Sequence, residues 1–498
     1  MMAQCNSKGH CLKSGLWTRQ GSFTPRESAC TASQESHSKM KIVAALFLLC
    51  CCTFAGSRAN RVYVHPFYLF AAENVSCETL QTQNKPLEMM AVAPLDMDVL
   101  TPDTRNVSQV DTQRQNITQR TAVLAELLNS LGLRMYQALS GKQQSGNVLL
   151  SPVNVYGTLV TFYLGASKKT ASSYQLLLGL SRATDNEDCV SLVDGHKVLR
   201  TLQSINSLVD DGPKDEINTQ VWAFTPPQTQ LAADFVHGTQ DFSDSSFIRS
   251  LDFNSQEAVQ QVNDFVEKTS GGKVKNMFTQ LNASSNLLFL SSFNFQGNWK
   301  TVFQAEKTTE QEFYVDETTT ITIPLMTHTG PYHYLNDKVR RCTVVKLSLS
   351  KRSYMLLILP HEGSSLREIE SKLRTNVMTS WNENLQEGLL ELSLPKFSMS
   401  AVNNMRDLLT NMDTQVEERL LGDQAEFSQL SDTQPFTVAM ALNKVTFEMS
   451  EEGTEAQATT HEAGIPLKLS INRPFFFSVV EGDSGAVLML GKVTNPAL

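Results

Sequence analysis

Short, nearly uninterrupted apolar runs, separated by amphipathic segments, constrain the fold of this chain most strongly. Three runs have the length of a strand: Leu287–Leu290, Tyr354–Leu359 and Phe475–Val480. A strand that is apolar on both faces belongs in the middle of a sheet covered on both sides. A looser alternation over Val438–Met449 indicates a further, longer strand. The sequence therefore predicts a mixed α/β domain built around buried sheets.

The first strong helical signal predicts where this domain begins. Apolar residues recur at three- and four-residue steps on one helical face, which ends at Gly141. They are Leu124, Leu127, Leu128, Leu131, Met135 and Leu139. A second helix is predicted after the apolar run Val148–Leu150, because Ser151 is a good N-cap and Pro152 suits the first helical position. We therefore expect one large domain over residues 120–498.

The composition excludes several classes of protein. The chain has 498 residues, 41% hydrophobic and 19% charged, with a formal net charge of −9. These values exclude a wholly disordered, collagen-like or coiled-coil chain. The acidic balance argues against general nucleic-acid binding, which needs a basic face. No apolar run reaches the roughly 18 residues of a membrane-spanning helix, so no membrane partner is expected.

The longest apolar run predicts a secretory signal. It covers Ile42–Phe54, follows Lys41 and precedes small residues that fit cleavage after Ala59. Its length matches the apolar core of a signal peptide, and a buried core helix is the weaker alternative. Residues 1–59 are therefore predicted to be a leader with a signal peptide, and the protein to be secreted into plasma. The charged segment before the run is unusually long, so translation from Met40 is an alternative start.

Residues 70–119 are predicted to be a flexible, glycosylated tail. From Gln81 to Gln119 the sequence is rich in Gln, Thr, Asn and Asp and lacks sustained periodicity. Such a segment buries too little apolar area to offset the entropy of ordering. The sequence after the leader has four Asn-x-Ser/Thr acceptor sites for glycosylation, three of them in this tail. They are Asn74, Asn106, Asn116 and Asn282.

Motifs of catalysis and metal binding are absent. The sequence contains no HExxH, GxGxxG or GxSxG motif and no phosphate-binding loop, and its histidines are scattered. Asp483–Gly485 superficially resembles a serine-protease nucleophile segment, but it lies between two strand-like runs, so a hairpin turn is predicted. Cys77, Cys189 and Cys342 follow the leader without metal-ligand spacing, and three cysteines allow at most one internal disulfide. We expect no enzyme, no cofactor and no metal, with Cys342 a buried free thiol in a strand.

Seven segments in matching order resemble the serpin family. Phe293-Asn-Phe-Gln-Gly-Asn-Trp299 with Phe303 is similar to the family motif N-x-(Y/F)-F-K-G-x-W-x-x-x-F. The others are Asn147–Val153 followed by Leu164–Ala166, Asn263–Val266 with Thr269, Gly272 and Lys273, Leu394–Phe397, Glu451–Ala456, Arg473–Phe475, and Gly491 with Pro496. The resemblance implies a mixed α/β serpin fold with three β-sheets, eight or nine helices and an exposed reactive loop, here preceded by an extended N-terminal tail.

The resemblance also implies a hinge for the reactive loop. In inhibitory serpins this hinge enters a sheet as an extra strand and carries the attached protease with it. Insertion needs small or uncharged side chains at alternate positions, because a strand points every second residue inward. Thr454, Ala456, Ala458 and Thr460 meet that need. The predicted hinge comprises Glu452, Gly453, Thr454, Glu455 and Ala456. From Glu451 to Phe475 the loop has 25 residues, fewer than inhibitory members usually have, which favours the fold over inhibitory activity.

The stretch exposed by cleavage after Ala59 resembles a peptide hormone. Asn60–Leu69 is similar to angiotensin I, with the shared core Arg-Val-Tyr-Val-His-Pro-Phe at Arg61–Phe67 and a fish-like Asn in first place. That hormone is released from a non-inhibitory serpin by renin, an aspartic protease. Such a protease binds its substrate extended, with bulky apolar residues on both sides of the cut. The resemblance therefore implies cleavage between Leu69 and Phe70.

A second cut and a receptor are implied by the same resemblance. Cleavage between Phe67 and Tyr68 by angiotensin-converting enzyme would leave a vasoactive octapeptide that acts on angiotensin receptors and regulates blood pressure and fluid balance. Its expected receptor contacts are a cation, a phenol, an imidazole and an aromatic ring. These belong to Arg61, Tyr63, His65 and Phe67. Pro66 is expected to keep this stretch out of a helix.

The family resemblance implies a disulfide between Cys77 and Cys189, which would tether the hormone-bearing tail or simply stabilise the fold by closing a loop.

Three functions stay open. The first is a secreted prohormone whose serpin body is the carrier and renin-recognition surface. The second is an inhibitor of a serine protease, and the third is a hormone-binding serpin. The short loop and the intact decapeptide favour the prohormone, and we expect a monomer.

Overall fold

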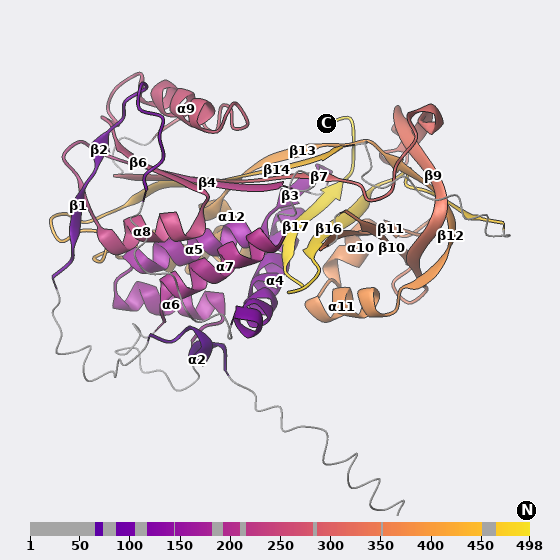
Figure 1. The fold of residues 1–498 in the computed structure, drawn as a ribbon, viewed down its shortest axis with the longest axis horizontal. Helices are drawn as coiled ribbons and strands as arrows, with labels where there is room; N and C mark the ends of the chain where they lie inside the picture. Colours follow the sequence, from indigo (N-terminus) through magenta and orange to yellow (C-terminus); the bar gives the residue numbers. More distant parts are fainter. Residues whose placement is uncertain are drawn as a thin grey trace, which may run out of the picture. The chain divides into compact units, whose positions relative to one another are not determined.

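The computed structural model describes residues 65–72, 86–104, 117–143, 145–181, 193–209, 216–281, 286–349, 352–450 and 465–498. All of them belong to one compact unit, residues 64–498. Within these ranges the chain forms eleven α-helices and three β-sheets (Figure 1). The predicted mixed α/β class with three sheets is therefore confirmed.

The helices of the described residues outnumber the eight or nine that the resemblance implies. They are α2 (Pro66–Phe70), α4 (Ile117–Lys142), α5 (Pro152–Gly165), α6 (Lys168–Leu178), α7 (Gly195–Val209), α8 (Ala233–Phe242), α9 (Ala258–Thr269), α10 (Leu366–Ser371), α11 (Thr375–Glu383), α12 (Met405–Met412) and α13 (Thr414–Leu420). Three of them, α2, α10 and α13, have only five to seven residues. Helices this short contain too few turns to show a helical period in the sequence.

One of the two large sheets has six strands. Its order is β13 (Met399–Asn404), β14 (Val438–Ser450), β7 (Leu287–Asn298), β4 (Glu216–Thr225), β6 (Ser245–Ser250) and β2 (Ala93–Pro94). β14 and β7 run parallel and pair directly, from Val438 opposite Leu287 to Ser450 opposite Asn298. The strands predicted from Leu287–Leu290 and Val438–Met449 are therefore neighbours in the same sheet.

A nine-stranded sheet contains the other two apolar runs. Its order is β15 (Leu467–Ser470), β12 (Gln386–Pro395), β9 (Thr320–Asp337), β10 (Cys342–Ser348), β11 (Ser353–Pro360), β16 (Phe475–Glu481), β17 (Val487–Val493) and β3 (Val148–Leu150), with β8 (Thr309–Tyr314) beside β9. β11 and β16 lie next to each other in its middle, as their continuous apolar sequences predict. A small third sheet pairs β1 (Met89–Ala91) with β5 (Gln230–Ala232).

Residues 86–104 belong to the folded body, although the sequence predicts a flexible tail over residues 70–119. Here β1 pairs with β5, and β2 extends the six-stranded sheet beside β6. Strands of two or three residues are held by backbone hydrogen bonds and are too short for an alternating pattern. The flexible-tail prediction is therefore wrong for residues 86–104, for residues 117–119, which lie in α4, and for Phe70 and Ala71, which end α2 and bridge to Val193.

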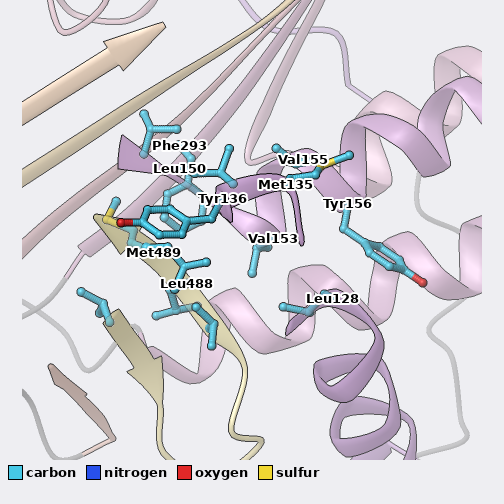
Figure 2. Packing of buried hydrophobic residues seen from close by; sticks show 14 of the residues in the cluster. Leu128, Met135, Tyr136, Leu150, Val153, Val155, Tyr156, Phe293, Leu488 and Met489 are labelled. Carbon is cyan, nitrogen blue, oxygen red and sulfur yellow. The ribbon is translucent and has the colours of Figure 1, made fainter. Parts of the chain in front are cut away.

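The described helices other than α9 share one main core with the two large sheets, and α9 packs in a second, smaller core. Met135 and Tyr136 of α4 belong to it together with Val153 and Val155 of α5, and Figure 2 shows these side chains near one another. The amphipathic face predicted for α4 is confirmed, since Leu124, Leu128, Leu131 and Met135 are all buried. Ser151 caps α5 as predicted, because its side chain accepts the N–H of Asn154 at 3.3 Å.

A buried polar group joins the six-stranded sheet to the helices beneath it. The side-chain amide of Asn443, on β14, donates to the Ser291 hydroxyl of β7 at 2.7 Å and to the Thr158 hydroxyl of α5 at 2.9 Å. All three side chains are fully buried. Because each bond is shielded from water and fixes a different element, this group sets the position of β14 against both β7 and α5.

We predict that Asn443→Ala lowers the free energy of unfolding by about 2 kcal/mol, because two buried hydrogen bonds are lost and their hydroxyl partners lose a donor. Urea denaturation followed by circular dichroism measures this loss. Asn411→Ala, on the partly exposed surface of α12, is the control and is expected to change stability by less than about 0.5 kcal/mol. Equal stabilities of the two variants would contradict the role given to Asn443.

Candidate functional site

The predicted cleavage sites lie in a described segment, residues 65–72, which holds His65, Phe67, Tyr68, Leu69 and Phe70. The other predicted site residues lie outside the described residues. They are Arg61 and Tyr63, the cysteines Cys77 and Cys189, the glycosylation sites Asn74, Asn106, Asn116 and Asn282, and the hinge residues Glu452, Gly453, Thr454, Glu455 and Ala456. The geometry of the candidate site is therefore that of the segment around the two cuts.

This segment forms a short helix, α2, which contradicts the expectation that Pro66 keeps it extended. Pro66 is the first helical residue, where its missing N–H has no partner to lose and its fixed φ suits the helix. His65 caps the turn: its Nδ1 accepts the N–H of Phe67 at 3.2 Å, and its carbonyl accepts the N–H of Tyr68 at 3.0 Å. The expectation failed because it applied the rule for a helix interior to a helix start.

Two aromatic side chains anchor α2 to the body. Phe67 is 4% exposed and Phe70 is 0% exposed, and both belong to the main core, where α2 packs against α4 and α7. Tyr68, between them, is 60% exposed and meets the Phe67 ring edge-on at 5.4 Å. Burying a phenylalanine side chain stabilises the folded state by about 1.5–3 kcal/mol. The two anchors therefore hold the sequence on both sides of Leu69 against the body.

The start of α7 holds the chain just after the predicted cut. The Phe70 carbonyl accepts the N–H of Asp194 at 2.8 Å, and Ala71 forms an antiparallel bridge with Val193. The Lys197 ammonium group also donates to the Ala71 carbonyl at 3.1 Å. The Leu69–Phe70 bond thus has backbone contacts on one side and the α2 turn on the other.

The described conformation does not present the Leu69–Phe70 bond as an extended strand. The bond lies at the end of a helix, and the Phe70 side chain is in the core. A protease cleft that binds an extended chain needs this side chain in its own pocket. Cleavage therefore requires residues 65–72 to leave their position on the body, which is a local opening rather than global unfolding.

The segment Asp483–Gly485 forms the predicted hairpin turn between β16 and β17. The Glu481 carboxylate accepts the N–H groups of Asp483 at 2.9 Å and Ser484 at 2.7 Å. Gly485 has a φ of 73°, which favours glycine at this position. Ser484 is thus part of a turn whose hydrogen bonds are satisfied by a neighbouring carboxylate.

Cys342 is a buried free thiol in β10, as predicted. Burial raises its pKa to about 12, so its nucleophilic thiolate form is scarce near neutral pH. In the part of the chain that the structure describes, no three His, Cys, Asp or Glu side chains form a group that could hold a metal ion. None of the described helices is both long and apolar enough to cross a membrane.

We predict that Phe70→Ala accelerates hydrogen exchange at the Asp194 amide, which donates to the Phe70 carbonyl, by 100-fold or more. A buried phenylalanine truncated to alanine costs about 3–5 kcal/mol, and each 1.4 kcal/mol shifts the opening equilibrium tenfold. Tyr68→Ala is the matched control and should change this rate less than threefold, roughly, because that side chain is mostly exposed. An unchanged rate in Phe70→Ala would show that other contacts hold α2.

Comparison with known proteins identifies relatives over most of the chain. The family model Serpin (serine protease inhibitor) matches residues 126–496. Angiotensinogen of Rattus norvegicus is 32% identical over 473 residues, and angiotensinogen of Bos taurus is 30% identical over 471 residues. Each alignment covers 90% of this chain and 97% of the relative.

Solved structures show the same fold. Human thyroxine-binding globulin, solved in complex with thyroxine, is 25% identical with a TM-score of 0.66, and the match covers 76% of this chain and 99% of that one. The mouse protein-Z dependent protease inhibitor is 24% identical with a TM-score of 0.67, covering 77% and 100%. The predicted serpin fold is therefore confirmed. The chain belongs to the serpin family, and within that family it belongs with the angiotensinogens.

Proposed function

We propose that this chain is a secreted prohormone, which renin cleaves between Leu69 and Phe70 to release the decapeptide Asn60–Leu69. The observation that carries the proposal is the core Arg61–Phe67, placed directly after the predicted signal cleavage in a chain that aligns along nearly its whole length with angiotensinogens. The predicted leader, residues 1–59, and the four glycosylation acceptor sites support export into an extracellular fluid.

Further processing follows from the same sequence. A cut between Phe67 and Tyr68 by angiotensin-converting enzyme leaves an octapeptide with a free carboxylate on an aromatic residue. That peptide offers angiotensin receptors the cation of Arg61, the phenol of Tyr63 and the imidazole of His65, which suit charge pairing and aromatic burial. In this account the hormone acts on blood pressure, and the precursor itself catalyses no reaction.

The serpin body sets how often the cleavage site is available. Renin acts on the fraction of molecules in which residues 65–72 have left the body, so the cleavage rate scales with that fraction. The docked fraction depends on the burial of Phe67 and Phe70 and on the contacts that α7 makes with Ala71. The exposed Tyr68 side chain is available to a protease before the segment opens.

Incubation of the purified, secreted chain with renin tests the proposal. We expect two products by mass spectrometry, a peptide that ends at Leu69 and a body that begins at Phe70. Leu69→Asp should reduce cleavage at least tenfold, roughly, because a charged side chain is costly in an apolar protease pocket.

A synthetic peptide of residues 60–72 is the positive control for the enzyme. A body that keeps its N-terminal sequence, while renin cleaves this peptide, would contradict the prohormone function. A covalent complex with a serine protease that survives SDS, with a cut within residues 463–470, would instead support the alternative of an inhibitory serpin.

We predict that Lys197→Met accelerates renin cleavage of the whole protein by about three- to tenfold. The variant loses the hydrogen bond from a charged donor to the Ala71 carbonyl, which destabilises the docked segment by about 1 kcal/mol at this partly exposed position. Initial rates at a renin concentration well below that of the substrate give the comparison.

Arg200→Met is the control for this prediction. Arg200 lies about one turn further along α7, where its guanidinium is 3.8 Å from the carboxylate of Asp241 in α8. A cleavage rate equal in the two variants would mean that the Lys197 contact does not limit opening.

A further inference from the structure

The described part of the tail, residues 86–104, binds the outer edge of the six-stranded sheet; we call this segment the strap. Its strand β2 lies beside β6, with Ala93 opposite Arg249 and Pro94 opposite Ser250 (Figure 1). The N–H of Leu95 donates to the Ser250 carbonyl at 2.8 Å. Pro94 has no N–H to offer a further strand, so the strap also closes this edge.

A partly buried ion pair fixes the far end of the strap. One carboxylate oxygen of Asp103 accepts from the Arg249 guanidinium at 2.7 Å, and the other accepts the N–H of Ile248 at 2.7 Å. Arg249 also donates to the Thr101 carbonyl at 3.1 Å, and the N–H of Asp103 donates to the Ser246 carbonyl at 2.8 Å. The Arg249 side chain is 5% exposed and the Asp103 side chain is 30% exposed. Loss of the Asp103 charge would leave the buried Arg249 guanidinium without its carboxylate, so this contact resists displacement of the strap from β6.

The strap also binds β5, which lies outside that sheet. The N–H of Val92 donates to the Thr229 carbonyl at 3.3 Å, and the N–H of Ala233 donates to the Glu88 carbonyl at 2.7 Å. β5 is itself bound to the chain that leads into β14, since the N–H of Ala232 donates to the Leu430 carbonyl at 2.8 Å. A continuous path of hydrogen bonds therefore runs from β6, through the strap and β5, to the segment before β14.

This path spans the boundary between β14 and β7, which we call the seam. β7, β4 and β6 lie on one side of the seam, and β14 and β13 lie on the other. An additional strand can enter this sheet at the seam only if β6 and its neighbours move away from β14. The strap joins β6 to β5, and the N–H of Ala232 in β5 binds the Leu430 carbonyl ahead of β14, so this movement stretches at least one hydrogen bond of the path.

We propose that residues 86–104 restrain the seam, so that the sheet resists accepting an additional strand although the hinge side chains would allow insertion. This goes beyond the prohormone function, and its failure would leave renin cleavage between Leu69 and Phe70 unaffected. The restraint lies in residues that the sequence places in the tail rather than in the serpin domain.

The test uses the whole protein and a synthetic peptide with the sequence of residues 451–464 as the inserting strand. Native gel electrophoresis and the rise in melting temperature report its stable uptake. We expect wild type to take up the peptide slowly. Asp103→Asn removes the charge that Arg249 binds and is expected to take it up at least tenfold faster. Val92→Pro removes the N–H bound to Thr229, and it carries the test if Asp103→Asn fails to fold.

Two controls separate the restraint from a general loss of stability. Asp98→Asn changes an exposed carboxylate of the strap, and Trp381→Phe removes a buried hydrogen bond of 2.8 Å to Asp337 outside the sheet. Both should take up the peptide as slowly as wild type. The proposal would be overturned if wild type and a folded strap variant took up the peptide at the same rate, whether that rate is fast or slow. Acceleration in Trp381→Phe equal to that in Asp103→Asn would also overturn it.

Discussion

Thirteen residues of β14 lie parallel to twelve residues of β7, and this pairing connects the two halves of the six-stranded sheet. The amide of Asn443 adds side-chain hydrogen bonds to both β7 and α5 from the middle of the same strand. This contact also positions neighbouring helices. Helix α5 packs in the main core, and α4 and α7 pack against α5 there. The short helix α2 then packs against α4 and α7.

The body and the α2 segment, residues 65–72, are thermodynamically linked. Phe67 and Phe70 occupy the same core as the helices beneath them, while Lys197 and Asp194 hold the backbone that follows. Under the proposed prohormone function, the serpin scaffold would act on proteolysis by fixing how often one peptide bond is accessible. Its contribution would be to the rate of hormone release rather than to the chemistry of the cut.

Continuous apolar runs predicted the central strands correctly, because residues such as those of Phe475–Val480 are buried whichever face they occupy. Ser151 and Pro152 predicted a helix start for the same local reason. The prediction failed at Pro66, where a proline begins a helix instead of preventing one, and at residues 86–104. Their order comes from backbone pairing and from the ion pair of Asp103 with a residue 146 positions away, which no local pattern contains.

Hydrolysis between Leu69 and Phe70 would divide the two aromatic anchors between the products. The departing peptide carries Phe67, whereas Phe70 stays with the body, whose new N-terminus remains bound at Asp194. Neither fragment alone keeps both aromatic rings, so the peptide loses the avidity that a single chain gave it. Departure would then be favoured over rebinding, and the cleaved body would not sequester the peptide that it had released.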